Sequence, residues 1–153
     1  MVQTNADLRL LTHTYQGTVG ARTGTALQHM ARVGQDFGLT PDGLYEGPEF
    51  TRWTIEGVRA ELRAGRPVIA LVKYRLLPGH EDSRFRADHY IVIHGMDGDD
   101  FLYHDPAFES PWEGAARWID APWLEEAMRP TFPRQQAVAF GPGRHSALPL
   151  LGV

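Results

Sequence analysis

The spacing of apolar residues predicts two helices in the first half of the chain. Over residues 25–37 apolar side chains recur at near-helical intervals, and Gly38 ends the pattern. A second helix is predicted over Thr54–Ala64, because Thr54 is a good N-cap residue and Gly65 follows the last apolar position. A weaker pattern over Asn5–Leu11 predicts a short helix before these two.

The second half of the chain has the character of strands. Val68–Tyr74 is a near-continuous β-branched run that is typical of a buried strand in the middle of a sheet. His89–His94 and Phe101–Asp105 are predicted to form a hairpin, joined by the Gly- and Asp-rich turn Gly95–Asp100. Gln136–Phe140 is a candidate last strand.

The remaining segments are punctuated by Pro, Gly and polar residues, apart from a short helix predicted over Pro122–Met128. Loops or irregular structure are expected over Tyr15–Gly24, Leu39–Arg52, Leu76–Ala87 and Ser110–Ala121, with a loosely held tail over 141–153. Helices that precede strands in this way indicate an α+β fold with a mainly antiparallel sheet, in a single domain over residues 1–153.

Composition narrows the possible functions. The 153 residues are 42% hydrophobic and 22% charged, which fits one globular core. A net charge of -4 with interspersed signs gives no basic stripe for nucleic acid, so no nucleic-acid partner is expected. No signal peptide and no apolar run of roughly 18 residues are present, so no membrane insertion is expected and the location stays open.

The predicted hairpin carries a candidate catalytic pair, His89 and Asp105. With a six-residue turn, Asp105 would stand opposite Tyr90, and a one-residue shift would be needed to bring the pair onto one face. An imidazole beside a buried carboxylate has a fixed tautomer and a stabilised cation, which suits a general base. The alternative is structural, with Asp105 only accepting hydrogen bonds from backbone amides.

Histidines also bind zinc, and four of the seven in this chain lie in or near the hairpin: His80, His89, His94 and His104. Strand alternation would direct His94 and His104 away from the face of His89 and Asp105. A site that uses all of them conflicts with the hairpin geometry, so no metal and no cofactor are predicted.

Six segments together resemble a known family. In chain order they are ADL at 6–8, GT followed by a helix that ends in FGL, VRAELRAGRPVIALV at 58–72, the pair DHYIVIHGMD and FLYHDPA at 88–107, and WIDAPWLEEAM at 118–128. Their order over about 7–140 resembles the papain-like cysteine peptidases of clan CA, family thirty-nine, which cut double-glycine leaders from bacteriocins.

This resemblance implies a papain-like fold in which His89 is the general base and Asp105 its orienting acid. The family also has a glutamine and then a Cys-Gly-Pro sequence at the start of an N-terminal helix. The chain contains no cysteine, and Gln3 has no cysteine or serine at a suitable distance after it. The nucleophile helix is therefore expected to be missing, whether it is encoded upstream, lies on another chain or has been lost.

Two functions follow from the resemblance. The first is a cysteine peptidase-type domain for peptide-bond or related acyl hydrolysis that is inactive as this chain alone, and the second is a non-catalytic peptide-binding pseudo-peptidase. A missing helix would leave apolar surface beside His89 and Asp105, for a peptide or protein substrate, the missing segment or a second copy. Candidate residues of the substrate groove are Tyr90, Trp53 and Trp112, with Trp118 as a further aromatic residue.

Overall fold

The structure is a computed structural model that describes residues 11, 14–17, 24–108 and 110–142. Contacts group the chain into two compact units, one formed by Met1–Pro41 with Phe140–Val153 and a larger one formed by Asp42–Ala139. The expected single domain over 1–153 stays a prediction. The tail from residue 143 and the helix predicted over 5–11, apart from Leu11, lie outside the described residues.

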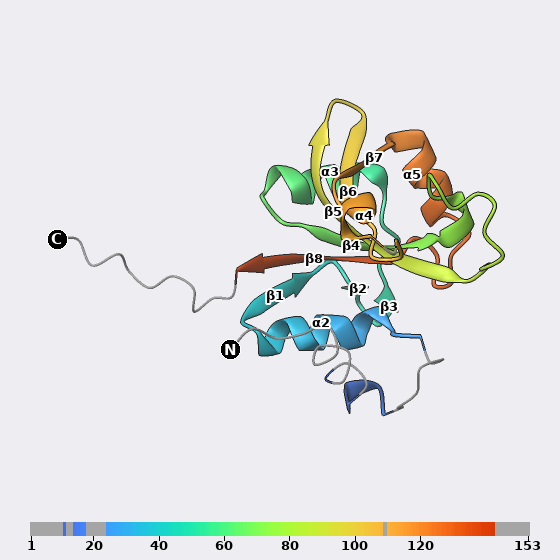
Figure 1. The fold of residues 1–153 in the computed structure, drawn as a ribbon. Coiled ribbons are helices and arrows are strands. Elements are labelled where there is room, and N and C mark those ends of the chain that lie inside the picture. Colours follow the sequence, from blue (N-terminus) through green and yellow to red (C-terminus); the bar gives the residue numbers. More distant parts are fainter. Residues whose placement is uncertain (1–10, 12–13, 18–23, 109, 143–153) are drawn as a thin grey trace. The chain divides into compact units, whose positions relative to one another are not determined.

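The helices and strands follow one another along the chain (Figure 1). In order they are α2 (Leu27–Asp36), β1 (Leu39–Asp42), β2 (Tyr45–Glu46), β3 (Glu49–Phe50), α3 (Ile55–Arg63), β4 (Val68–Lys73), the 3-10 helix η1 (Tyr74–Leu76), β5 (Asp88–Asp97), β6 (Asp100–His104), α4 (Pro111–Gly114), β7 (Arg117–Asp120), α5 (Ala121–Met128) and β8 (Ala137–Pro142).

The helices predicted over 25–37, Thr54–Ala64 and Pro122–Met128 are confirmed. The side chain of Thr54 accepts a hydrogen bond of 3.0 Å from the Gly57 amide, which satisfies one of the unpaired N–H groups at the start of α3. Gly38 and Gly65 follow α2 and α3 with positive φ angles of 79° and 75°, a conformation that favours glycine. Helix α5 begins one residue before the predicted start.

The larger unit is built on an antiparallel sheet with the strand order β8, β4, β5, β6, β7. Val68–Lys73 lies between two neighbouring strands and is buried at most of its positions, as its β-branched run predicts. The expected α+β fold with a mainly antiparallel sheet is therefore confirmed.

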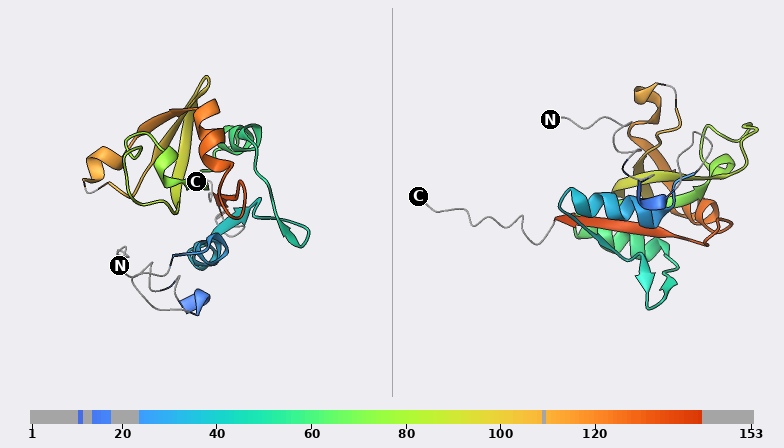
Figure 2. Two further views of the ribbon diagram at one scale, coloured as in Figure 1. Left: turned by 90° about the vertical axis from the view of Figure 1, so that its right-hand side faces the viewer. Right: turned by 90° about the horizontal axis from the view of Figure 1, so that it is seen from below.

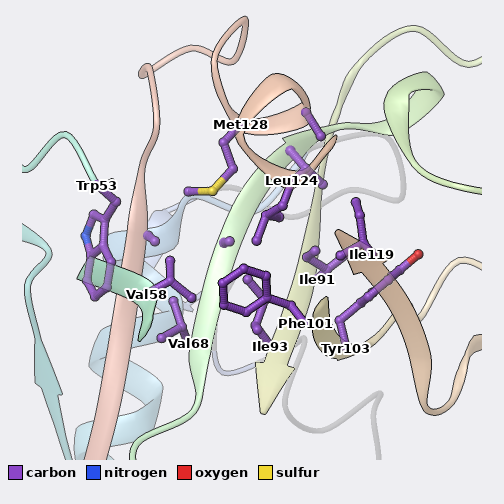
Figure 3. Close-up of a cluster of buried hydrophobic side chains, with 14 of the residues drawn as sticks. Trp53, Val58, Val68, Ile91, Ile93, Phe101, Tyr103, Ile119, Leu124 and Met128 are labelled. Atoms are coloured by element: carbon purple, nitrogen blue, oxygen red, sulfur yellow. The ribbon is translucent and has the colours of Figure 1, made fainter. Parts of the chain in front are cut away.

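Helices α3 and α5 contact each other and cover one face of this sheet (Figure 2). Val58 of α3 and Leu124 of α5 pack there against the inward side chains of β4, β5 and β6 (Figure 3). Ile91 and Phe101 are completely buried in this cluster. Helices α3 and α5 thus cover the core residues of this face, while the apolar surface expected beside His89 and Asp105 stays a prediction.

Two predicted loops contain regular structure. Leu39–Arg52 holds the short strands β1 to β3, and Ser110–Ala121 holds α4 and β7. In β7, Ile119 is buried while Trp118 is half exposed, so the strand alternates between core and solvent. Four residues are too few for this alternation to be recognised from sequence.

The smaller unit contains α2, nearly all of β1 and the end of β8. Strands β1 and β8 are hydrogen-bonded neighbours. Gly34 of α2 lies against the ring of Phe140, and a Cβ atom at position 34 would come within 2.6 Å of that ring. A larger residue at position 34 would therefore have to displace this ring. In the part of the chain that is described, no helix has both the length and the apolar character needed to cross a membrane.

Thr54→Ala is expected to lower the free energy of unfolding by about 1 kcal/mol, because it removes the N-cap of α3. Urea unfolding followed by circular dichroism measures the change. Thr54→Ser keeps the hydroxyl and is expected to retain most of the stability. Equal losses in the two variants would show that the cap hydrogen bond does not contribute.

Candidate active site

The register of the β5–β6 hairpin places His89 and Asp105 on the same face of the sheet. Asp97 pairs with Asp100, so the turn has two residues rather than the predicted six. A register shift between Ile93 and Gly95 then brings Ile93 opposite Tyr103. Continued along the strands, this register sets Asp105 opposite Ile91, and His89 lies two residues away on the same face. The one-residue shift that the sequence required is thus present.

His89 and Asp105 are in direct contact. Nε2 of His89 lies 2.8 Å from Oδ1 of Asp105, and the Asp105 side chain has no exposed surface. The His89 side chain is 17% exposed. The imidazole uses Nε2 on the carboxylate, so Nδ1 is the nitrogen left for a reacting group.

A second imidazole, which the sequence reasoning did not place in the pair, binds the same carboxylate. Nε2 of His80 lies 2.7 Å from Oδ2 of Asp105. The Ala107 amide donates a hydrogen bond of 2.9 Å to Oδ1. His80 had been grouped only with the zinc candidates, because no strand periodicity predicts the direction of a side chain inside the Leu76–Ala87 loop.

The main chain of Asp105 is held as closely as its side chain. Its amide donates a hydrogen bond of 2.8 Å to the carbonyl oxygen of Gly114. A Cβ atom at position 114 would lie 2.0 Å from the carbonyl oxygen of Asp105, so only glycine permits this approach. The α4 segment therefore fixes the backbone at Asp105, directly after the end of β6.

Aromatic rings surround the two imidazoles. The ring of Tyr74 stacks on His80 at 4.0 Å between centroids and meets His89 edge-on at 5.2 Å. Phe108 contacts the His80 ring at 4.6 Å. Phe85, from the Leu76–Ala87 loop, is 52% exposed and lies edge-on against Tyr74 at 5.1 Å. The site is therefore apolar around a hydrogen-bonded centre.

The hydrogen bonds keep Asp105 ionised despite its burial. Burial raises the pKa of the Asp105 carboxyl, but hydrogen bonds from His89, the Ala107 amide and His80 outweigh that effect and hold the pKa below its ordinary value. For Tyr74, burial and then the charge of Asp105 raise the pKa of the phenol. An ionised carboxylate can only accept hydrogen bonds, so both imidazoles donate to Asp105 from Nε2.

His94 and His104 lie away from this pair, as strand alternation predicts. Their rings stack on each other at 4.1 Å, and both residues are exposed. Burial and then the neighbouring His104 lower the pKa of His94. Among the residues whose positions are described, no three His, Cys, Asp or Glu side chains are arranged to hold a metal ion.

Of the predicted groove residues, Trp53 lies in the core and Tyr90 lies on the other face of the sheet from His89. Trp53 is part of the buried core and donates a hydrogen bond of 2.7 Å from Nε1 to the Gly43 carbonyl, and Figure 3 shows it at the opposite end of the cluster from Tyr103. Tyr90 follows His89 in β5 and so points to the other face of the sheet.

The other two tryptophan candidates are exposed. Trp112 is 86% exposed on α4, and Trp118 is half exposed on β7. The aromatic residues that contact these imidazoles are Tyr74 and Phe108, and Phe85 lies against Tyr74. All three precede or follow the strands. Periodicity within a strand could not have identified them.

Comparisons with known proteins match the chain to one peptidase family. The model of the Peptidase_C39 like family matches residues 4–125. The crystal structure of an inferred C39-like peptidase from Bacillus anthracis superposes with a TM-score of 0.51 at 16% identity. That match covers 77% of this chain and 60% of the other, so the chain spans less than two thirds of that protein, and the likeness concerns the fold alone. No curated protein matches.

Replacing Asp105 by Asn is expected to make the free energy of unfolding depend less steeply on pH in the acidic range. The folded-state pKa of Asp105 lies below its ordinary value, so the stability it contributes is present above about pH 4 and is lost as pH falls through the folded pKa. The wild type should therefore lose up to about 1.4 kcal/mol per pH unit more than Asp105→Asn in that range. Urea unfolding at a series of pH values measures the difference. Parallel curves would contradict an ionised Asp105.

Proposed function

The chain belongs to the Peptidase_C39 like family, and on that premise we propose that His89 and Asp105 are the base and the orienting acid of a cysteine peptidase triad. The observation that carries this proposal is the contact between Nε2 of His89 and the buried Asp105 carboxylate, which leaves Nδ1 of a partly exposed imidazole available. The reaction class is acyl transfer from a peptide.

The geometry suits both halves of such a reaction. A thiol beside Nδ1 would give its proton to His89, and the thiolate would attack the peptide carbonyl. His89 would then return that proton to the leaving amine, as the C–N bond breaks and a thioester forms. In the second half Nδ1 would take a proton from water, whose oxygen attacks the thioester carbonyl. The C–S bond then breaks, the carboxylic acid product leaves, and His89 returns the proton to the sulfur. Throughout the reaction Asp105 would accept the hydrogen bond from Nε2–H of His89.

The thiol is not among these 153 residues, since the chain contains no cysteine. We propose that a thiol-bearing helix outside this sequence supplies it, and that the chain alone does not hydrolyse peptides by this route. The thiol of that helix would approach Nδ1 of His89, on the side of the imidazole that Asp105 does not occupy.

The test joins a helix peptide of the family pattern, a Gln followed by Cys-Gly-Pro, to Met1 through a flexible Gly/Ser linker. Such a linker gives the thiol an effective concentration of about millimolar. At about pH 6 the thiol is expected to react with iodoacetamide roughly tenfold faster than in the separate peptide, because an imidazolium neighbour stabilises the thiolate.

His89→Gln in the fusion is the decisive control, because it removes the charged partner and is expected to return the alkylation rate to that of the separate peptide. His94→Gln removes an imidazole from the other face and should leave the rate unchanged. An alkylation rate in the fusion that equals that of the separate peptide would contradict the catalytic proposal.

A second candidate is a peptide-binding domain without catalysis. It is favoured by the absence of cysteine together with the exposed ring of Phe85, which lies against Tyr74 next to His89. An exposed aromatic side chain beside apolar rings can bury a peptide side chain. In this candidate Asp105 and the imidazoles would serve as a fixed wall of the peptide site.

Phe85→Ala is expected to weaken binding of a synthetic peptide with a Gly-Gly pair about tenfold, the loss that follows from roughly 1.4 kcal/mol of apolar contact. Tyr45→Ala is the matched control, because Tyr45 is similarly exposed but stacks on Phe50 in the β2–β3 hairpin. Fluorescence titration of the thiol-free chain measures both variants. Equal affinities of Phe85→Ala and the wild type would exclude Phe85 from the peptide site.

A further inference from the structure

We propose that His80 is a positioning residue for His89, and that it acts by holding Oδ2 of Asp105 so that Oδ1 stays directed at Nε2 of His89. This inference rests on the proposed function, because it gives His89 the role of the reacting base. It assigns a role to a residue that the resemblance to the peptidase family did not single out.

The two imidazoles occupy different oxygens of one carboxylate. Nε2 of His80 lies 2.7 Å from Oδ2, and Nε2 of His89 lies 2.8 Å from Oδ1. The Ala107 amide also donates to Oδ1, at 2.9 Å. With a donor on each oxygen, rotation of the carboxylate about its Cβ–Cγ bond would break hydrogen bonds at both. His80 thereby sets the orientation of Oδ1 through its hydrogen bond to the other carboxylate oxygen, Oδ2.

Exposure distinguishes the roles of the two imidazoles. The His80 side chain is 7% exposed, against 17% for His89. The His80 ring is in contact with Tyr74 at 4.0 Å and with Phe108 at 4.6 Å, and the Arg117 guanidinium lies over the Phe108 ring at 4.3 Å. A ring enclosed in this way has no room to meet a substrate, whereas His89 reaches the surface. His80 therefore acts through Asp105.

The Leu76–Ala87 loop holds His80 in this place at its backbone as well. The His80 amide donates a hydrogen bond of 3.1 Å to the Leu77 carbonyl, and the Ser83 amide donates one of 3.0 Å to the His80 carbonyl. Leu77 is completely buried, and Arg117 donates from Nη2 to the Pro78 carbonyl at 3.0 Å. His80 is thus held by contacts to its ring and by hydrogen bonds to its main chain, as a hydrogen-bond donor of fixed position requires.

The first experiment uses the wild-type chain without a thiol. With 15N-labelled histidine, NMR at about pH 8 is expected to show both His80 and His89 in the tautomer that carries the proton on Nε2. A proton on Nδ1 of His80 would overturn the proposal, because that ring could then not donate to Asp105.

The second experiment compares two replacements of His80. His80→Phe keeps an aromatic ring between Tyr74 and Phe108 but has no N–H donor, so exchange of the His89 Nε2 proton with water is expected to quicken about tenfold. His80→Gln retains an N–H donor and is expected to restore most of the protection. His94→Phe is the matched control on the other face of the sheet, and it should leave the exchange rate unchanged.

Unfolding of His80→Phe in urea separates positioning from stability. With a folded variant, an exchange rate of the His89 proton equal to that of the wild type would overturn the proposal, and so would a failure of Gln to restore protection. If His80→Phe does not fold, the wild-type tautomers and the His80→Gln variant still decide the question. Thiol reactivity of the fusion tests the proposed function separately, so the two ideas can fail independently.

Discussion

A carboxylate that has lost all its contact with water must be paired with donors, because an unpaired buried charge costs several kcal/mol. Asp105 meets this requirement with His80, His89 and the Ala107 amide. Each donor comes from a different part of the chain: a loop, strand β5 and the turn after β6. The ion therefore fixes three segments against one another at one end of the sheet, and the geometry of the candidate active site depends on it.

That arrangement is possible because the hairpin has one particular register. A two-residue turn and a register shift after Ile93 set Asp105 on the same face as His89. The same face carries Ile91, Phe101 and Tyr103 in the buried core. Since a slip of one residue would move the core residues of a strand into solvent, the hydrophobic core and the contact between His89 and Asp105 stabilise the same register. Core packing thus maintains the geometry of the candidate site.

The chain belongs to a peptidase-like family, but it contains no cysteine and therefore lacks the thiol that a cysteine peptidase uses. This chain holds an imidazole in contact with a buried carboxylate, and aromatic rings beside them. Tyr74 joins these parts, because its ring touches both His80 and His89 and supports the exposed Phe85. In both proposals the peptide would lie against these aromatic rings, with or without a thiol at Nδ1 of His89. The catalytic and the binding proposals therefore share one site.

The sequence by itself determined the helices α2 and α3 and strand β4, because helix caps and β-branched runs are local patterns. It offered His89 and Asp105 as a pair only on condition of a one-residue shift in the hairpin, and that shift depends on the whole fold. Tertiary structure decided the rest. His80 lies in a loop, where no periodicity sets the direction of a side chain, and only folding brings it to Asp105. Trp53 could not be distinguished from a groove residue by its type, and packing placed it in the core. Contacts between residues distant in the chain depend on the whole fold, and a single sequence carries no local signal for them.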